Sequence, residues 1–116
     1  MRFLFAVLLL LPGIGLADEV RILDVKVDCR GSCSFAVTVE HADEGWNHYA
    51  DQWDVMTLDD ELLGTRVLYH PHENEQPFTR SLSGVTVPPG TKQVKIRARD
   101  SVHGYSAQEF LVDIPD

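Results

Sequence analysis

An alternation of apolar and polar residues with a period of two runs through most of the chain after residue 18. In segment 23–28 the odd positions are apolar and the even positions are charged, and similar alternation recurs in segments 35–39, 94–99 and 110–114. Successive side chains of a β-strand point to opposite faces, so this pattern is typical of antiparallel strands with one buried face. No stretch of ten or more residues beyond residue 18 keeps an apolar stripe at helical spacing. The pattern therefore predicts an all-β protein.

Turn-forming residues divide this alternating chain into seven short segments. Strands are expected at about 20–28, 33–40, 51–57, 62–69, 79–87, 92–99 and 106–114. Turn signals lie at 30–32, 59–60 and 88–90, and Gly84 is placed where a bulge would absorb a switch of the inward face. Seven short strands in about 100 residues predict an immunoglobulin-like antiparallel β-sandwich. Trp53 is expected between the two sheets, and Trp46 is expected to be exposed.

The first 17 residues are expected to be a signal peptide rather than part of the fold. Arg2 precedes an apolar run at 3–11, and Gly15 and Ala17 place small residues where a signal peptidase cleaves. No other apolar run approaches the length of a bilayer. We expect cleavage after Ala17 and a single domain at 18–116 that is periplasmic or secreted, monomeric and not inserted in a membrane.

The charge balance of the chain is acidic. Eighteen Asp and Glu residues outnumber ten Lys and Arg residues, which gives a formal net charge of −8. An acidic surface repels phosphate backbones and anionic lipids, so nucleic acid and membrane surfaces are poor candidate partners. A cationic partner or a metal ion remains compatible with this charge, which also favours solubility.

The two cysteines, Cys29 and Cys33, are separated by three residues that suit a tight hairpin loop. In an oxidising compartment such a pair predicts a disulfide. The alternative is a copper or redox site of the C-x3-C type. Such thiol sites need an activating neighbour, and no histidine is near in the sequence.

All five histidines fall in three expected loops, at 41–50, 70–78 and 100–105. In a seven-stranded sandwich the chain reverses after each strand, so these loops, which follow the second, fourth and sixth strands, share one end. The loops at the other end contain no histidine. This segregation is the main functional signal in the sequence.

Imidazole is the commonest transition-metal ligand, and several imidazoles with a carboxylate suit zinc, copper or iron. The expected core ligands are His48, His72 and His103, with His41, His70 and Asp100 as further candidates and Glu73 and Glu75 as nearby oxygen donors. Each residue also has a structural interpretation. Loop histidines are often solvated, Asp100 could cap its turn, and Gly104 could supply a positive dihedral angle.

The same three loops contain aromatic residues, so an interaction module that binds a periplasmic protein without metal is the alternative. The anchors of that interface would be Trp46, Tyr49, Phe78 and Tyr105, because aromatic side chains contribute much of the binding energy in interfaces. The sequence shows no nucleophile–base pair, glycine-rich phosphate loop or spaced carboxylate dyad. An enzyme with this sequence would therefore depend on a metal.

Residues 41–53, HADEGWNHYADQW, together with DSVHG at 100–104 resemble the iron-binding pattern of superoxide reductases, also called desulfoferrodoxins. Those proteins are immunoglobulin-like domains in which a histidine pair precedes the third strand and a Cys-x-x-His-Gly turn completes the site. The resemblance implies His41 and His48 as the pair and His103 as the ligand of the turn.

Asp100 stands at the family's cysteine position, so a superoxide-reductase-like metalloenzyme, a further alternative, would lack its thiolate. The chain is also similar to the small carrier subunits of sulfur oxidation and to small exported bacterial immunoglobulin-like domains. These similarities imply the sandwich fold and no particular activity.

Overall fold

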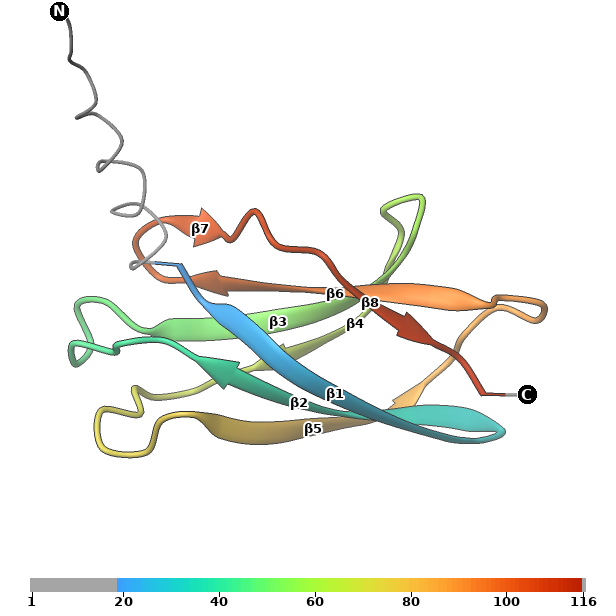
Figure 1. The fold of residues 1–116 in the computed structure, drawn as a ribbon, viewed down its shortest axis with the longest axis horizontal. Helices are drawn as coiled ribbons and strands as arrows, with labels where there is room; N and C mark the ends of the chain where they lie inside the picture. The colour runs from blue at the N-terminus through green and yellow to red at the C-terminus, as the bar shows by residue number, and fades with distance from the viewer. Residues whose placement is uncertain (1–18, 116) are drawn as a thin grey trace, which may run out of the picture.

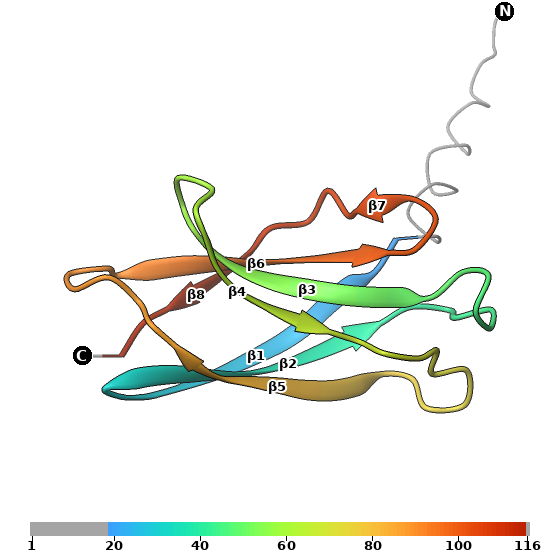
Figure 2. The ribbon, with the colours of Figure 1, turned by 180° about the vertical axis from the view of Figure 1, so that it is seen from behind.

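The computed structural model describes residues 19–115, in which two antiparallel β-sheets pack face to face (Figures 1 and 2). The expected signal peptide at 1–17 lies outside the described residues. Among residues 19–115, no helix is long and apolar enough to cross a bilayer.

The described part of the chain contains eight strands. They are β1 (Arg21–Arg30), β2 (Ser32–Glu40), β3 (Ala50–Thr57), β4 (Leu62–Val67), β5 (Phe78–Val85), β6 (Gln93–Asp100), β7 (Gly104–Tyr105) and β8 (Phe110–Asp113). One sheet has the order β1-β2-β5, and the other has β4-β3-β6, with both β7 and β8 paired to β6. All these pairings are antiparallel, and the predicted fold class is confirmed.

The expected seventh strand at 106–114 is shortened to β8 at 110–113, and the short strand β7 lies before it, within the expected loop at 100–105. The short strand β7 completes a hairpin with the end of β6, and β8 pairs with the beginning of β6. Between them the Ser106 hydroxyl donates a hydrogen bond to the Val20 carbonyl, and the Ser106 side chain is buried. The Ser106 N–H still donates to the Ala98 carbonyl of β6 at 2.9 Å, while its hydroxyl ties the chain to the segment that precedes β1.

The core lies between the two sheets. Trp53 in β3, Phe35 in β2 and Ile96 in β6 each have no exposed surface, so the prediction for Trp53 is confirmed. Full burial of one such apolar side chain contributes about 1.5–3 kcal/mol of transfer free energy. Trp46 is 67% exposed, as expected.

Two bulges adjust which side chains reach the core. In β2–β5 the register shifts between Cys33 and Phe35, opposite Gly84, which has a φ of 71°, and the predicted bulge is confirmed. A second shift, between Ile22 and Asp24 in β1, turns Leu23 outward, where it is 40% exposed. The simple alternation of the sequence placed Leu23 inward, which is wrong because the bulge changes the face.

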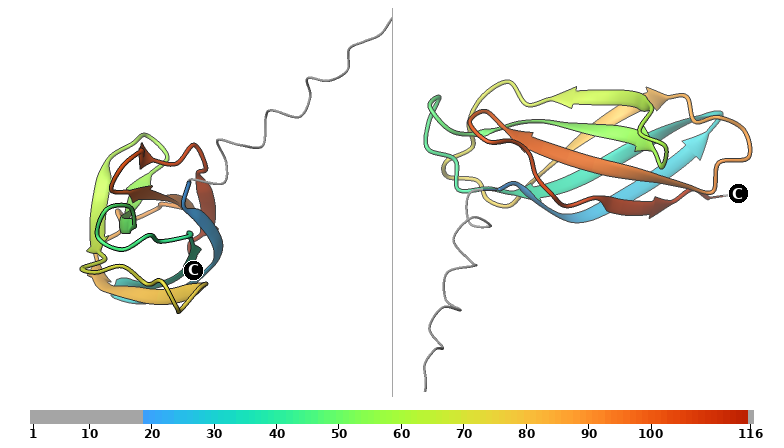
Figure 3. Two further views of the ribbon diagram at one scale, coloured as in Figure 1. Left: turned by 90° about the vertical axis from the view of Figure 1, so that its left-hand side faces the viewer. Right: turned by 90° about the horizontal axis from the view of Figure 1, so that it is seen from above.

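The β1–β2 turn contains the predicted disulfide. Cys29 and Cys33 are joined, with an S–S distance of 2.04 Å, and Gly31 in the turn has a φ of 86°. Among the described residues no cysteine is free. Figure 1 shows this hairpin at the end of the sandwich opposite the β2–β3, β4–β5 and β6–β7 loops. These three loops meet at one end, as expected, and Figure 3 (left) looks onto that end.

Candidate metal centre

Asp100, the last residue of β6, lies at the centre of the histidine-containing end, and its side chain is fully buried. Its Oδ1 accepts hydrogen bonds from the backbone N–H groups of Val102, at 2.8 Å, and His103, at 2.6 Å. Asp100 therefore caps its own turn, and the positive φ of 77° expected at Gly104 closes it. The other oxygen, Oδ2, has no hydrogen-bond partner among the described residues. Buried carboxylate oxygens without a partner are uncommon, and either a water molecule or an ion could satisfy this one.

His41 follows directly after β2 and places its ring against Asp100. The ring is almost completely buried, and its Nε2 lies 3.9 Å from Oδ2 of Asp100. On the other side of the ring, Nδ1 is hydrogen-bonded to Oδ1 of Asp43 at 2.7 Å. One ring nitrogen thus faces a carboxylate in its own loop, and the other faces the carboxylate at the end of β6.

His48 approaches the same carboxylate from the far side of the β2–β3 loop. Its Nε2 lies 3.3 Å from Oδ1 of Asp100, and its Nδ1 lies 3.2 Å from a carboxylate oxygen of Glu44. The Nε2 atom is buried and has no hydrogen bond among the described residues. The ring centroids of His41 and His48 are 4.8 Å apart. The ligand atoms of His41, His48 and Asp100 all lie within 4.8 Å of one another.

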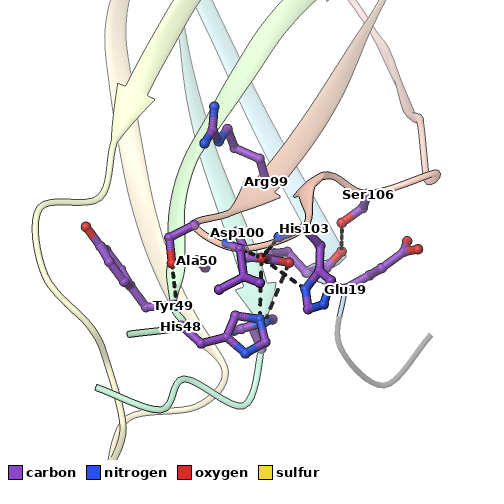
Figure 4. Close-up of polar contacts among 12 residues, drawn as sticks. Glu19, His48, Tyr49, Ala50, Arg99, Asp100, His103 and Ser106 are labelled. Atoms are coloured by element: carbon purple, nitrogen blue, oxygen red, sulfur yellow. Dashed lines mark hydrogen bonds and ion pairs between the residues drawn. The ribbon is translucent and has the colours of Figure 1, made fainter. Parts of the chain in front are cut away.

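His103 is on the solvent side of this group. Its Nδ1 lies 3.3 Å from Oδ1 of Asp100, and its ring is 4.9 Å from the His48 ring, centroid to centroid. Figure 4 shows His48 and His103 both reaching the carboxylate of Asp100. The His103 side chain is 45% exposed, so its ring stands where the site opens to solvent.

The electrostatics of Asp100 favour a bound cation. Burial raises its pKa, but the hydrogen bonds from the backbone of His103 and Val102 and the nearby rings of His103 and His48 lower it further than burial raises it. The net pKa lies below its ordinary value, so Asp100 is ionised at neutral pH. A proton on a facing imidazole ring or a metal ion would each pair with this buried charge.

Asp43 forms a second layer behind His41. Its side chain is completely buried, and it accepts hydrogen bonds from the backbone N–H groups of Ala50, at 3.0 Å, and His72, at 2.8 Å. Burial raises the pKa of Asp43, but its hydrogen bonds from His41, His72 and Ala50 bring the net pKa below its ordinary value. Metal-ligating histidines commonly make such a carboxylate contact through their second ring nitrogen.

The structure does not bring the rings of His72 and His70 into this group. His72 stacks on Phe78, with 3.9 Å between ring centroids and an angle of 16° between planes, and His70 lies beside it at 4.7 Å. The Nε2 atom of His72 is 3.1 Å from a guanidinium nitrogen of Arg80, which donates to it. Burial, Arg80 and His70 all lower the pKa of His72, so its ring is neutral. A guanidinium at this nitrogen occupies the place that a metal ion would need.

The remaining candidates have other surroundings. Glu75 is paired with Arg80, with 3.2 Å between carboxylate and guanidinium. Trp46 packs edge-on against Tyr49, with centroids 5.6 Å apart. Phe78 is only 3% exposed beneath His72, and the hydroxyl of Tyr105 donates to the carboxylate of Asp54. These aromatic residues therefore do not form one continuous exposed surface.

Sequence reasoning missed Asp43 and Glu44, which contact the outer nitrogens of the two buried rings. A signal for Asp43 exists in the segment His41-Ala42-Asp43, where a carboxylate follows a histidine by two residues directly after a strand. The position of His72 has no such signal, because its ring is held by Phe78 and Arg80 of the next strand.

Comparison with known proteins identifies a relative of this chain. The chain is 42% identical over 97 residues to a protein of the archaeon Halomicrobium mukohataei that is called "Putative lipoprotein". The match includes 82% of this chain and 47% of the relative, so the chain spans about half the length of that protein. No family model matches the chain, and no solved structure matches it.

Proposed function

We propose that this chain is an exported β-sandwich domain that binds a transition-metal ion at its loop end. The ligands are His41, His48 and Asp100, and His103 is the fourth donor at the solvent side. The observation that supports this most directly is the convergence of donor atoms around Asp100. Its Oδ2 and the Nε2 of His48 are buried without hydrogen-bond partners among residues 19–115, and the Nε2 of His41 lies 3.9 Å from that oxygen.

The spacing of the donors suits a small ion. Zinc binds histidine nitrogens and carboxylate oxygens at about 2.0–2.2 Å, so two ligands of a tetrahedral ion lie roughly 3.3 Å apart. The Nε2 of His48 is 3.3 Å from Oδ1 of Asp100, and the longer His41 distance of 3.9 Å requires only a small movement of one side chain. Three imidazoles and one carboxylate are typical ligands for zinc or copper, and iron accepts the same donors.

Export is supported by the expected signal peptide at 1–17, by the disulfide, and by the name of the archaeal relative, which describes a lipoprotein. We expect the mature protein to begin at Asp18. Mass spectrometry of protein recovered from the cell envelope or the medium checks this, and a chain that retains residues 1–17 would contradict it.

A second candidate function is protein binding at the same end. The observation that favours it is Trp46, which is 67% exposed beside Tyr49 in the loop that also contains His48. A partner would then bury Trp46, and removal of metal would leave the binding unchanged. A superoxide-reductase-like activity is a less supported candidate, because Asp100 replaces the thiolate that this chemistry uses.

The metal proposal is tested by elemental analysis of the mature protein purified without a histidine tag, followed by titration with zinc(II) or copper(II). For zinc, imidazole NMR resonances of His41, His48 and His103 should shift and saturate at one equivalent, while His72 should move little. If the first three resonances do not move at stoichiometric metal, the proposed metal site is wrong.

A further inference from the structure

The segment HPHENEQPF at 70–78, called the 70–78 loop here, consists of the β4–β5 loop from His70 onward and Phe78, the first residue of β5. It contains two histidines that do not join the metal group, yet it is bound to that group through its backbone. The N–H of His72 donates to Oδ2 of Asp43 at 2.8 Å, while Oδ1 of the same carboxylate contacts His41. Gln76 adds a second link, because its side-chain oxygen accepts from the N–H of His41 and its amide nitrogen donates to the carbonyl of His72.

Asp43 also determines which nitrogen of His41 can bind a metal. An ionised carboxylate accepts hydrogen bonds and cannot donate them, so the proton of a neutral His41 ring resides on Nδ1. The lone pair is then on Nε2, the atom that lies 3.9 Å from Oδ2 of Asp100. The opposite tautomer would direct a proton toward Asp100 and exclude a metal from that nitrogen.

Both observations depend on the buried side chain of Asp43. The Asp43 side chain has no exposed surface, and its oxygens accept from a ring of the metal group, from the N–H of Ala50 at the start of β3 and from the N–H of His72. Any movement of His41 toward an ion must therefore be accommodated by Asp43 and by the loop that holds its other oxygen.

We propose that Asp43 is a positioning residue that fixes His41 in its metal-binding tautomer and links occupation of the metal site to the order of the 70–78 loop. This inference rests on the proposed metal-binding function. In this proposal His70 and His72 lie outside the coordination shell. The order of the 70–78 loop then depends on whether the metal site is occupied, although the loop contributes no ligand.

The test compares the parent protein with Asp43→Asn, using zinc as the probe. Asparagine preserves the shape of the side chain, but its amide nitrogen can donate to Nδ1 of His41 and so favour the opposite tautomer. The matched control is Asp54→Asn. Asp54 is also buried, at 3% exposure, and accepts from Thr65 and Tyr105 rather than from a proposed ligand.

Three quantities are measured at neutral pH. They are the zinc affinity by calorimetry, the tautomer of His41 from its ring 15N shifts, and the hydrogen-exchange rate of the His72 amide with and without zinc. In the parent and the control we expect Nδ1 of His41 to be protonated, and we expect zinc to slow hydrogen exchange of the His72 amide. Asp43→Asn should bind zinc about 10–100-fold more weakly, the usual effect of losing such a partner, and should lose the zinc effect on His72.

The possible outcomes distinguish failure of this inference from failure of the proposed metal site. If the parent binds no zinc, copper or iron, the proposed function fails and this inference with it. If the parent binds zinc and Asp43→Asn binds equally well with the same protection at His72, only the role of Asp43 is refuted. The 15N measurement on the parent needs no variant, so it tests the proposed tautomer of His41 even if Asp43→Asn does not fold. Protonation of Nε2 in the zinc-bound parent would overturn the proposal.

Discussion

Replacing Asp100 with asparagine separates the two roles of this residue, because asparagine can still cap the turn but cannot supply a negative charge. The Oδ1 of Asp100 accepts the N–H groups of Val102 and His103, and an amide oxygen can accept both. The Oδ2 atom, which has no hydrogen-bond partner in the described part of the chain, becomes an uncharged NH2 group. We therefore expect the metal-free variant to fold as the parent does and to lose most of its affinity for zinc.

The magnitude follows from linkage between binding and folding. Zinc at a hundredfold excess over its Kd stabilises the parent by about 2.7 kcal/mol. For a domain of this size each kcal/mol raises Tm by about 4–8 °C, so the parent should gain about 10–20 °C. Loss of a residue that only contacts a metal ligand weakens metal binding by up to about 100-fold. Loss of a charged ligand itself should weaken zinc binding at least as much, by about 100-fold or more. At the same zinc concentration the variant should then gain only about 0.4 kcal/mol, or about 2–3 °C.

Thermal unfolding followed by circular dichroism, with and without zinc, measures both parts of this prediction. The Asp54→Asn variant is the control for removal of a buried carboxylate elsewhere in the sandwich. A zinc-induced rise in Tm as large for Asp100→Asn as for the parent would refute the argument that Asp100 is the centre of the site. If Asp54→Asn lost the zinc-induced rise in Tm to the same extent, the loss would not be specific to the site around Asp100.

Three further predictions concern the surroundings of the site and the core. His72→Ala should leave zinc affinity within about threefold of the parent by calorimetry, and a larger loss of affinity would place His72 in the coordination shell. It should cost more than about 0.5–1.5 kcal/mol of stability, because an aromatic pair contributes that much beyond its buried area and His72 is only 6% exposed. Trp53→Ala should cost about 3–5 kcal/mol in urea unfolding, because the side chain is fully buried, and a variant as stable as the parent would contradict its place in the core. The pKa values of Asp43 and Asp100 are lowered in the folded state, so these residues contribute stability above an unfolded-state pKa of about 3.9 that is lost as pH falls through their folded values. The urea midpoint of the metal-free protein should therefore drop below about pH 4, and an equally large drop in a variant with both residues changed to asparagine would show that other groups are responsible.

Local patterns in the sequence were sufficient for the fold. The period-two alternation predicted strands wherever one face of a segment is buried, and turn residues separated them, so the sandwich and the burial of Trp53 could be predicted. Gly84 marked a bulge because its position coincided with a change of the inward face. The bulge that exposes Leu23 had no such marker, and the alternation gave the wrong face there.

The sequence also determined which end of the sandwich holds the histidines, because chain reversal after each strand places the loops at 41–50, 70–78 and 100–105 together. It did not determine which rings meet within that end. His41 and His48 reach Asp100 because their loop folds inward over the end of β6, whereas His72 lies flat against Phe78 beside Arg80. Side chains on converging loops can turn inward or along the surface with little difference in sequence. The choice depends on stacking and hydrogen bonds between residues distant in the chain, such as those of Asp43 to His41 and His72, and only the tertiary structure brings these residues together.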